Sequence, residues 1–580
     1  MPTNVKENGF ESSIVSWLVQ HNGYEQGSNA DYNKEIAMDE TRLFRFLNTT
    51  QADKMKQLRL ENDPLEKEKF LQRLDQSLHT NGVIDLLRKG FRYKHLVLDM
   101  FYVRPSPGNE TAAKLYAQNI FSVTRQLQYS RQNPLLALDV CLFLNGLPIA
   151  TMELKNQLTK QNAADAVKQY KDERTPDEVL FGFKRCIVHF AVDDNEVRMC
   201  TELKGQKSWF LPFNKGYNDG AGNPPNPDGI KTDYLWKEIL RKDDFSNIIE
   251  NYVQIICDED EETHKKSYKQ IFPRYHQLQL VTSLLADAKR DGVGKRYLIQ
   301  HSAGSGKSNS IAWLAHQLVT LKDATDHNIF DTVIVVTDRV NLDKQIRNTI
   351  RQFMQVSSTV GWAKDSSELG TLLEKGTKII ITIVHKFQFI LEDISKLHTN
   401  RSFAILIDEA HSSQNGDLST KMNIVLSGSE YDNDDLLEDK INTLIDGKKL
   451  AKNASYFAFT ATPKNKTLEV FGREEIQPDG SKRFFPHYVY TMKQAIEEHF
   501  IMDVLRYYTP IQSFYKLSKT VEDDPLFDKK KAQRLLRYYV ESNQYAIEQK
   551  AGIIVEHFHT EVIGRGKIGG RARAMVITSG

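Results

Sequence analysis

The sequence predicts an α/β protein whose second half contains a parallel sheet. Short β-branched segments alternate there with longer amphipathic ones, a pattern typical of a parallel sheet covered by helices on both faces. The expected strands are 296–300, 332–337, 378–384, 403–408 and 456–460. Earlier in the chain, two apolar segments flank Asn145-Gly146 and predict a β-hairpin over 135–155, because both turn residues tolerate positive φ.

Three other segments organise the rest of the chain. Residues 10–20 carry apolar side chains at helical spacing and predict a helix with one buried face. Residues 214–230 crowd Asn, Gly, Pro and Asp and predict a connector. The acidic run 258–262, followed by lysines, predicts either a solvated hinge between domains or the exposed start of a helix.

Composition limits the class of protein. The chain has 580 residues, 77 Lys and Arg against 76 Asp and Glu, and 40% hydrophobic residues, so we expect three or four globular domains. A net charge of +1 means that any nucleic-acid site depends on local basic patches. No apolar run approaches the ~20 residues of a membrane span, no signal peptide is visible, and the four cysteines are widely spaced. We expect a cytoplasmic protein without membrane association.

A nucleotide-binding loop is the clearest motif. Residues 303–308, Ala-Gly-Ser-Gly-Lys-Ser, lie between an expected strand and an apolar helix over 311–321. Glycines let backbone N–H groups surround a phosphate, Lys307 can reach the β- and γ-phosphates, and Ser308 can hold Mg²⁺. The residues expected to bind ATP are Gly304, Ser305, Gly306, Lys307 and Ser308. One departure is His301, where the full pattern has Gly or Ala.

A second motif, Asp-Glu-Ala-His, begins at Asp408 directly after the expected strand 403–408. A strand ending in Asp408 delivers a carboxylate to the Mg²⁺ at the sheet edge, and Glu409 can orient the attacking water.

From Arg274 to Pro463 the chain resembles the first RecA-like domain of superfamily 2 helicases and translocases. Residues 274–277 resemble the Q-motif, residues 335–339 motif Ia and residues 459–463 motif III. The resemblance implies adenine recognition at the first, DNA-backbone contact at the second, and coupling of ATP to DNA at the third and at the DEAH histidine. The residues that carry these roles are Arg274, Gln277, Arg339, His411, Thr460 and Thr462.

The predicted hairpin carries a second kind of chemistry. Asp139 lies on its first strand, and Glu153 and Lys155 lie two residues apart on its second, so alternation puts the last two on one face. Two carboxylates can bind one Mg²⁺, and an ammonium can activate water or stabilise charge on phosphorus. A half-buried hairpin with a structural salt bridge is the alternative, although burying three charges without a metal is costly.

This arrangement resembles the D…ExK site of PD-(D/E)xK endonucleases. The resemblance implies an additional acidic residue at Glu11 on the first helix, and a DNA-contacting glutamine at Gln169.

An endonuclease domain joined to a DEAH motor resembles the restriction and translocation (HsdR-type) subunit of type I restriction–modification enzymes. The resemblance implies ATP and Mg²⁺ as cofactors, double-stranded DNA as substrate, and modification and specificity subunits as partners, with S-adenosylmethionine used only by the methyltransferase partner. The expected domains are an endonuclease domain over 1–257, a first RecA-like domain over 258–465, and a linker with the start of a second RecA-like domain over 466–580. A buried strand is expected over 573–579, which suggests a chain cut short and poor ATP turnover.

Two other functions fit the same residues. One is a stand-alone defence or repair helicase–nuclease without a methyltransferase partner. The other is a non-catalytic DNA-binding or assembly module whose hairpin is structural.

Overall fold

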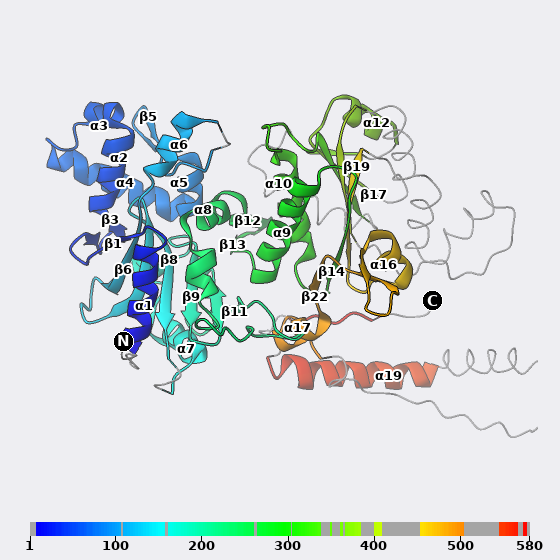
Figure 1. The fold of residues 1–580 in the computed structure, drawn as a ribbon. Helices are drawn as coiled ribbons and strands as arrows, with labels where there is room; N and C mark the ends of the chain where they lie inside the picture. The colour runs from blue at the N-terminus through cyan, green and yellow to red at the C-terminus, as the bar shows by residue number, and fades with distance from the viewer. Residues whose placement is uncertain are drawn as a thin grey trace, which may run out of the picture. The chain divides into compact units, whose positions relative to one another are not determined.

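The chain forms two compact units, Met1–Gln494 and Ala495–Gly580. The computed structural model (Figure 1) describes residues 7–105, 108–156, 160–259, 264–302, 304–337, 349–350, 360–363, 366–383, 400–408, 453–503, 544–566 and 572–576.

A mixed sheet forms the centre of the N-terminal part. Its strand order is β1 (Glu25–Gln26), β6 (Phe121–Gln128), β7 (Ala137–Leu144), β8 (Leu147–Leu154), β9 (Val188–Val192), β10 (Val197–Cys200) and β11 (Leu211–Pro212). Strands β6, β7 and β8 pair antiparallel, whereas β8 pairs with β9 in parallel. Every residue of β8 is buried, so polar groups on this strand lie inside the protein.

Helices surround this sheet. They are α1 (Glu7–Gln20), α2 (Glu40–Thr50), α3 (Ala52–Leu58), α4 (Pro64–Asn81), α5 (Val83–Lys89), α6 (Glu110–Ala117), α7 (Ala163–Glu173), η2 (Val179–Phe181), η3 (Leu235–Ile239) and α8 (Lys242–Asn251). Two small hairpins pair β2 (Tyr32–Asn33) with β3 (Met38–Asp39), and β4 (Phe91–Tyr93) with β5 (Leu96–Leu98). Helix α1 confirms the helix expected over 10–20, and its residues Ile14 and Leu18 are fully buried.

The β7–β8 hairpin confirms the turn predicted at Asn145-Gly146, where both residues have positive φ. The turn is buried. Its polar side chain has partners there, because Asn145 accepts the N–H of Ile120 (2.7 Å) and donates to the carbonyl of Met100 (2.9 Å). A Cβ at Gly146 would lie 2.7 Å from Cβ of Leu43 on α2. Glycine is therefore required both by the backbone conformation and by the close approach of α2.

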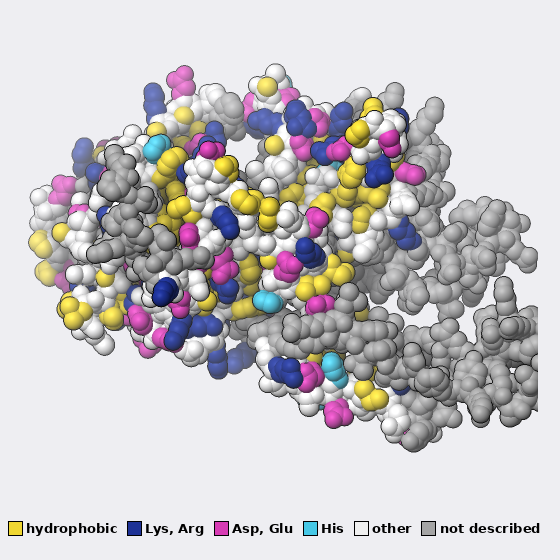
Figure 2. Space-filling view, turned by 60° about the horizontal axis from the view of Figure 1, so that its bottom comes forward, with side chains coloured by type: hydrophobic (Ala, Val, Ile, Leu, Met, Phe, Trp, Pro, Cys, Tyr) yellow, Lys and Arg dark blue, Asp and Glu magenta, His cyan; other side chains and the backbone are white. Residues whose placement is uncertain are grey.

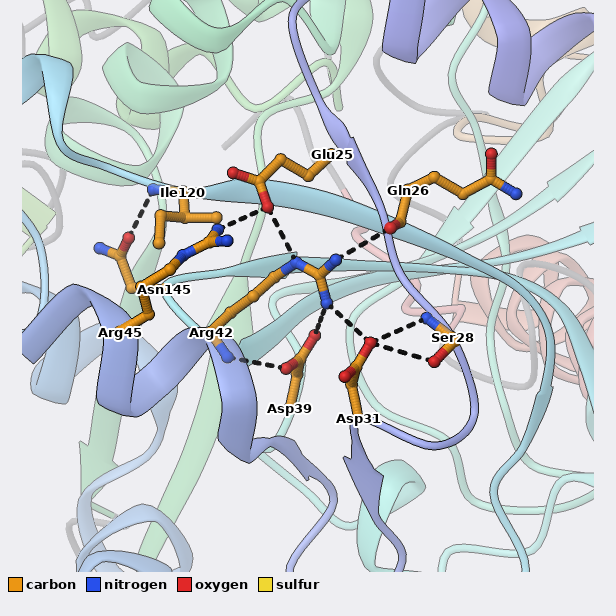
Figure 3. Close-up of polar contacts among 9 residues, drawn as sticks. All are labelled: Glu25, Gln26, Ser28, Asp31, Asp39, Arg42, Arg45, Ile120 and Asn145. Atoms are coloured by element: carbon orange, nitrogen blue, oxygen red, sulfur yellow. Dashed lines mark hydrogen bonds and ion pairs between the residues drawn. The ribbon is translucent and has the colours of Figure 1, made fainter. Parts of the chain in front are cut away.

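A buried arginine fastens α2 to the edge of this sheet (Figure 3). The Arg42 guanidinium contacts Asp39 (2.7 Å), Asp31 (3.2 Å) and Glu25 (3.3 Å), and donates to the carbonyl of Gln26 (2.8 Å). Figure 3 shows these acceptors converging on the guanidinium from β1, the following loop and the end of β3, just before α2. The network pairs a charge that would be costly to bury alone.

The second sheet is entirely parallel, as the sequence predicts. Its strand order is β16 (Val360–Trp362), β17 (Ile379–Ile383), β15 (Thr332–Thr337), β18 (Phe403–Ile407), β19 (Ala454–Thr460), β14 (Arg296–His301) and β22 (Tyr488–Tyr490). Alternate residues of β15 enter different apolar clusters, so both faces of the sheet are covered. Strand β22 lies beyond residue 465, the expected end of this domain.

Helices and small hairpins complete the second part. They are β12 (Gln254–Glu259), β13 (Lys266–Ile271), α9 (Tyr275–Asp291), α10 (Lys307–Thr320), α12 (Ser366–Glu374), α16 (Asn465–Phe471), β20 (Arg473–Ile476), β21 (Lys482–Phe485) and α17 (Met492–Glu497). Figure 1 shows α9 and α10 side by side along the sheet. The described start of the acidic run, residues 258–259, belongs to β12 and pairs with β13, so no helix begins there; the rest of the run, with the expected solvated hinge, lies outside the described residues.

The second unit contains α19 (Gln544–His557) and the π-helical turn η5 (Phe558–Ile563). The strand expected over 573–579 is wrong for its described part. Residues 573–576 have no regular structure, and Met575 and Val576 are exposed. No described strand pairs with them, and an unpaired strand cannot satisfy its backbone groups within the protein.

Candidate functional site

Asp139 and Glu153 lie opposite each other on β7 and β8. The register pairs Val140 with Met152, so the next positions outward are Asp139 and Glu153. Asp139 also accepts the backbone N–H of Leu154 through Oδ2 (2.8 Å). The hairpin therefore brings together the two carboxylates that the sequence places on its separate strands.

Glu153 is fully buried and shares its carboxylate with an arginine. Nε of Arg174 lies 2.6 Å from Oε1, and the same guanidinium donates to the Tyr129 hydroxyl (2.9 Å) and the Ala137 carbonyl (2.9 Å). Burial, and then the charge of Asp139, raise the pKa of Glu153 to about 8 in spite of Arg174. Oε2 of Glu153 is buried and accepts no hydrogen bond from a described donor, and a hydrogen bond between the Asp139 and Glu153 carboxyl groups contributes to the raised pKa.

Glu11 is linked to Asp139 by the side-chain amide of Gln126. Gln126 donates from Nε2 to Oε2 of Glu11 (2.8 Å) and to Oδ1 of Asp139 (3.1 Å). Arg125 holds the other oxygen of Glu11, with Nε 2.5 Å away. The acidic residue expected on the first helix is thus connected to the hairpin by the side chain of Gln126.

Lys155 directly follows β8 and is buried. Its backbone N–H donates to the carbonyl of Val192 (2.9 Å), which continues the pairing with β9 beyond Glu153. Because the backbone stays extended alongside β9, Lys155 lies on the same side of the strand as Glu153.

Helix α7 carries the glutamine that the sequence predicts for DNA contact. Oε1 of Gln169 is buried without a hydrogen-bond partner in the described part of the chain. The neighbouring Tyr170 is fully buried instead, with its hydroxyl 2.8 Å from Oγ1 of Thr151 on β8. Tyr170 therefore attaches the helix to the sheet.

The oxygen atoms of the hairpin fit a hard divalent cation. Mg²⁺ takes oxygen ligands, commonly from one or two carboxylates, with water and substrate phosphate completing its shell. Asp139 and Oε2 of Glu153 supply such oxygens. No group of three or more His, Cys, Asp or Glu side chains that could hold a metal occurs in the described ranges.

The nucleotide-binding loop lies at the carboxyl end of β14. Gly304 and Gly306 both have positive φ, and Lys307 opens α10. The first N–H groups of a helix have no acceptor within it, and its dipole favours an anion there. Loop and helix start therefore have the geometry of a phosphate site.

The expected Mg²⁺ ligand Asp408 approaches this loop from β18, which is separated from β14 by β19. Asp408 follows β18 directly, and Lys307 Nζ lies 4.0 Å from its Oδ1. Both side chains are largely buried. Ser308 lies next to Lys307 in the first turn of α10. Parallel strands end at one sheet edge, which brings these three residues together.

Arg274 and Gln277 contact the backbone of the phosphate loop, and their expected role in adenine recognition stays a prediction. Gln277 donates to the carbonyls of Gly306 (3.0 Å) and Ser305 (3.3 Å), while its own Oε1 accepts the N–H of Arg274 (3.0 Å). Arg274 reaches the carbonyl of Gly304 (3.5 Å). Arg274 and Gln277 therefore hold the backbone of the phosphate loop. The side-chain amide of Gln277 already has partners for both its nitrogen and its oxygen.

His301, the departure from the loop pattern, is a buried part of the same support. Its Nδ1 contacts the hydroxyl of Ser305, and its ring lies 5.3 Å from that of His276. His276 stacks on Tyr490 at 3.8 Å. Burial, with the charges of Arg274 and Lys307, lowers the pKa of His301 well below its ordinary value. A neutral imidazole here accommodates the cations around the loop.

The remaining motor residues are placed only in part. Thr460 ends β19 and is buried, and its hydroxyl accepts the N–H of the exposed Thr462 (3.3 Å). Glu409, His411 and Arg339 lie outside the described residues, so their expected roles stay predictions.

Sequence reasoning missed three residues at these sites. Arg174 and Gln126 hold the carboxylates of the hairpin, and Tyr490 stacks behind the phosphate loop. None lies in a motif, because each acts through a contact between distant segments. A buried carboxylate needs a partner, and this rule was the available signal for Arg174.

The second sheet and its loop define an α/β chain with a RecA-like helicase domain. Comparison with known proteins agrees: the family described as SWI2/SNF2 ATPase matches residues 276–535, and the type I restriction enzyme R protein N terminus (HSDR_N) matches residues 4–208. In these two matched segments the chain is similar to the HsdR-type subunits of type I restriction enzymes.

Individual relatives carry the same description. The HindI endonuclease subunit of the type I restriction enzyme from Haemophilus influenzae is 26% identical, over 62% of this chain and 33% of its own. The SauMSSORF170P endonuclease subunit from Staphylococcus aureus MSSA476 is 25% identical, over 80% of this chain and 45% of its own. The UvsW helicase of bacteriophage T4 aligns with TM-score 0.24 and 12% identity, over 40% of this chain and 65% of its own. This chain thus spans between a third and a half of the curated relatives named here.

The described residues include no helix that is both long and apolar enough to cross a bilayer.

Proposed function

We propose that this chain is the ATP-driven translocation and endonuclease subunit of a type I restriction–modification complex, acting on foreign double-stranded DNA away from the recognition site. The observation that carries the proposal is the close approach of Asp139 to the buried carboxyl group of Glu153, in the same chain as the Lys307–Asp408 contact. The match to HSDR_N supports the endonuclease part of the proposal, and the match to SWI2/SNF2 ATPase supports the translocation part.

At the endonuclease site, Asp139 and Glu153 would hold Mg²⁺, which when bound supplies a Lewis acid for the scissile phosphate. Arg174 fixes the Glu153 carboxylate, and Gln126 fixes Asp139, so both oxygens are oriented before a ligand arrives. Lys155, on the side of Glu153, is the group that would hold or deliver a proton at the attacking water or offset charge on the phosphate.

At the motor site, Gly304, Ser305, Gly306, Lys307 and Ser308 would hold ATP, with Ser308 and Asp408 as the ligands of its Mg²⁺. Glu409 would orient the attacking water, and Thr460, Thr462 and His411 would couple hydrolysis to movement on DNA through contacts such as Arg339. The modification and specificity subunits would read the target sequence. The setting would be cytoplasmic.

The proposal is tested in a complex reconstituted with modification and specificity subunits. Asp139→Asn and Lys155→Ala are expected to lower cleavage of plasmid DNA by at least ~100-fold while translocation continues, because they remove a metal ligand and a proton-transfer group. Lys307→Ala is expected to abolish ATP hydrolysis and to leave Mn²⁺ binding at the hairpin, measured by calorimetry, unchanged. Asp177→Asn, at an exposed carboxylate of the same domain, is the matched control.

Cleavage that persists in Asp139→Asn with translocation intact would favour a structural hairpin and a non-catalytic module. Full activity without any methyltransferase partner would favour the stand-alone helicase–nuclease.

A further inference from the structure

A groove of about 980 Å³ opens between α4 and the α5–β4 segment of the N-terminal part. Five of its lining side chains are cationic and one is acidic: Lys69, Arg73, Lys89, Arg92, Lys94 and Asp85. The whole chain carries a net charge of +1, and Figure 2 shows cationic and acidic side chains interspersed on the face in view. The excess of positive charge in the groove is therefore local and does not follow from the charge of the whole chain.

Internal ion pairs account for only part of this charge. Lys89 pairs with Asp85 at 2.7 Å, and Lys94 pairs with Glu66. Lys69, Arg73 and Arg92 are exposed and form no ion pair with any described residue. Glu66, already paired with Lys94, also interacts electrostatically with Lys69, but positive charge still exceeds negative charge on this surface. These cations repel each other unless an anion lies between them.

The groove is built on fixed elements. On α4, residues 69, 73, 76 and 80 recur at helical spacing, so one face of the helix forms a wall. Asp75 of α4 pairs with the buried Arg185 at 2.7 Å, and Arg88 of α5 donates to the carbonyl of Ile249 at 2.7 and 2.9 Å. These partly buried contacts hold both walls, so the cations need little rearrangement to bind a ligand.

Neutral donors accompany the cations. Gln76, Ser77, Thr80 and Asn81 also line the groove, and amides and hydroxyls beside lysine and arginine are typical partners of phosphodiester oxygens. The aromatic ring in the lining, Tyr93, is buried and bonded to Glu66, so it offers no exposed face for base stacking. The chemistry therefore favours the backbone of a duplex over unpaired bases.

We propose that this groove binds the phosphodiester backbone of double-stranded DNA, with Lys69, Arg73 and Arg92 as its phosphate contacts. The proposal rests on the proposed function for the presence of DNA, and adds a contact surface separate from both sets of catalytic residues. Because phosphate contacts are independent of base sequence, the groove would hold DNA of any sequence.

The test uses the full 580-residue chain and a fluorescent 30-base-pair duplex. The variant K69Q/R73Q/R92Q is expected to raise Kd about tenfold or more at 0.1 M salt and to reduce the slope of log Kd against log salt by about 2 to 3. K114Q/K207Q/K289Q removes the same charge at exposed lysines elsewhere and is expected to bind like the unaltered chain. The conservative variant K69R/R73K/R92K should restore binding.

A second measurement needs no substitution. Duplex DNA should protect Lys69 from acetylation, measured by mass spectrometry, and should leave Lys114 and Lys207 reactive. Equal binding by K69Q/R73Q/R92Q and its control, or no protection of Lys69, overturns the groove assignment while leaving the Asp139 and Lys307 results intact. Displacement of the duplex by an equimolar acidic peptide overturns it too and identifies the ligand as an acidic protein.

Discussion

Arg174 determines how the carboxylate of Glu153 is held. The two side chains are both almost fully buried and meet at 2.6 Å, and the arginine has further partners in Tyr129 and Ala137. A guanidinium with all these contacts is fixed in place, and it holds Oε1 of Glu153 while leaving Oε2 uncontacted.

Arg174→Ala is expected to lower the free energy of unfolding of the N-terminal part by about 3 kcal/mol, because it leaves a buried carboxyl group without its partner. The double variant E153M/R174M should recover most of this loss, since an apolar pair of similar volume removes the desolvation cost. Urea unfolding followed by tryptophan fluorescence measures both.

The matched control is Arg198→Ala, which breaks a partly exposed pair with Glu196 and should cost no more than about 1 kcal/mol. A loss in Arg174→Ala as small as in this control would mean that the buried pair contributes no net stability.

At the scale of elements, helix α7 is attached to the central sheet by a chain of three polar side chains. Oγ1 of Thr151 on β8 lies 2.8 Å from the Tyr170 hydroxyl and 2.7 Å from Nδ1 of His189 on β9. All three residues are buried, and burial lowers the pKa of His189 to about 3. The contact therefore depends on a neutral imidazole.

His189→Gln is expected to make the protein less sensitive to acid. In the unfolded chain a histidine has a pKa near 6.5, so between about pH 6.5 and pH 3 the unfolded state binds a proton that the folded state does not. The contribution of neutral His189 to the free energy of unfolding is therefore complete above about pH 6.5. Below that pH it falls by about 1.4 kcal/mol per pH unit. Between pH 7 and pH 5 the variant should lose about 2 kcal/mol less than the unaltered chain, measured by urea unfolding.

His79→Gln, at an exposed histidine of α4, serves as the comparison for this measurement. The same loss between pH 7 and pH 5 in all three proteins would show that His189 is not the group responsible.

The elements that the sequence predicts well are those specified by local patterns. The Asn145-Gly146 hairpin, the first helix and the parallel strands are all confirmed, because turn chemistry and apolar periodicity act within a few residues. The acidic run near residue 258 instead begins in a strand, because pairing with β13 prevails over a local charge pattern.

At the scale of the whole molecule, the sequence could not give the partners of the candidate residues. Glu153 and Arg174 meet across 21 positions, and Gln277 and Gly306 across 29. Such contacts depend on how helices pack on the sheets, which no motif spacing encodes. The motifs themselves still predict the right sheet edge, since strand order brings Lys307 and Asp408 together.

The unit Met1–Gln494 contains both sheets, and its largest apolar cluster continues from one to the other. Trp313 of α10 is fully buried in this cluster, donates to the carbonyl of Tyr252 (2.9 Å), and packs against its ring at 5.5 Å. A continuous apolar contact of this kind favours one cooperative unit over two independent domains.

We therefore expect calorimetry to show one main unfolding transition for this unit, raised as a whole by a non-hydrolysable ATP analogue. Trp313→Phe loses the indole hydrogen bond and should cost about 1 kcal/mol, whereas Trp313→Ala leaves a large cavity, should cost about 3 to 5 kcal/mol and should separate two transitions. Trp17→Phe, at a partly buried tryptophan on α1, is the control. The unaltered chain could instead show two transitions, of which the ATP analogue shifts only one. The two sheets would then unfold independently, and the Trp313 contact would not couple them.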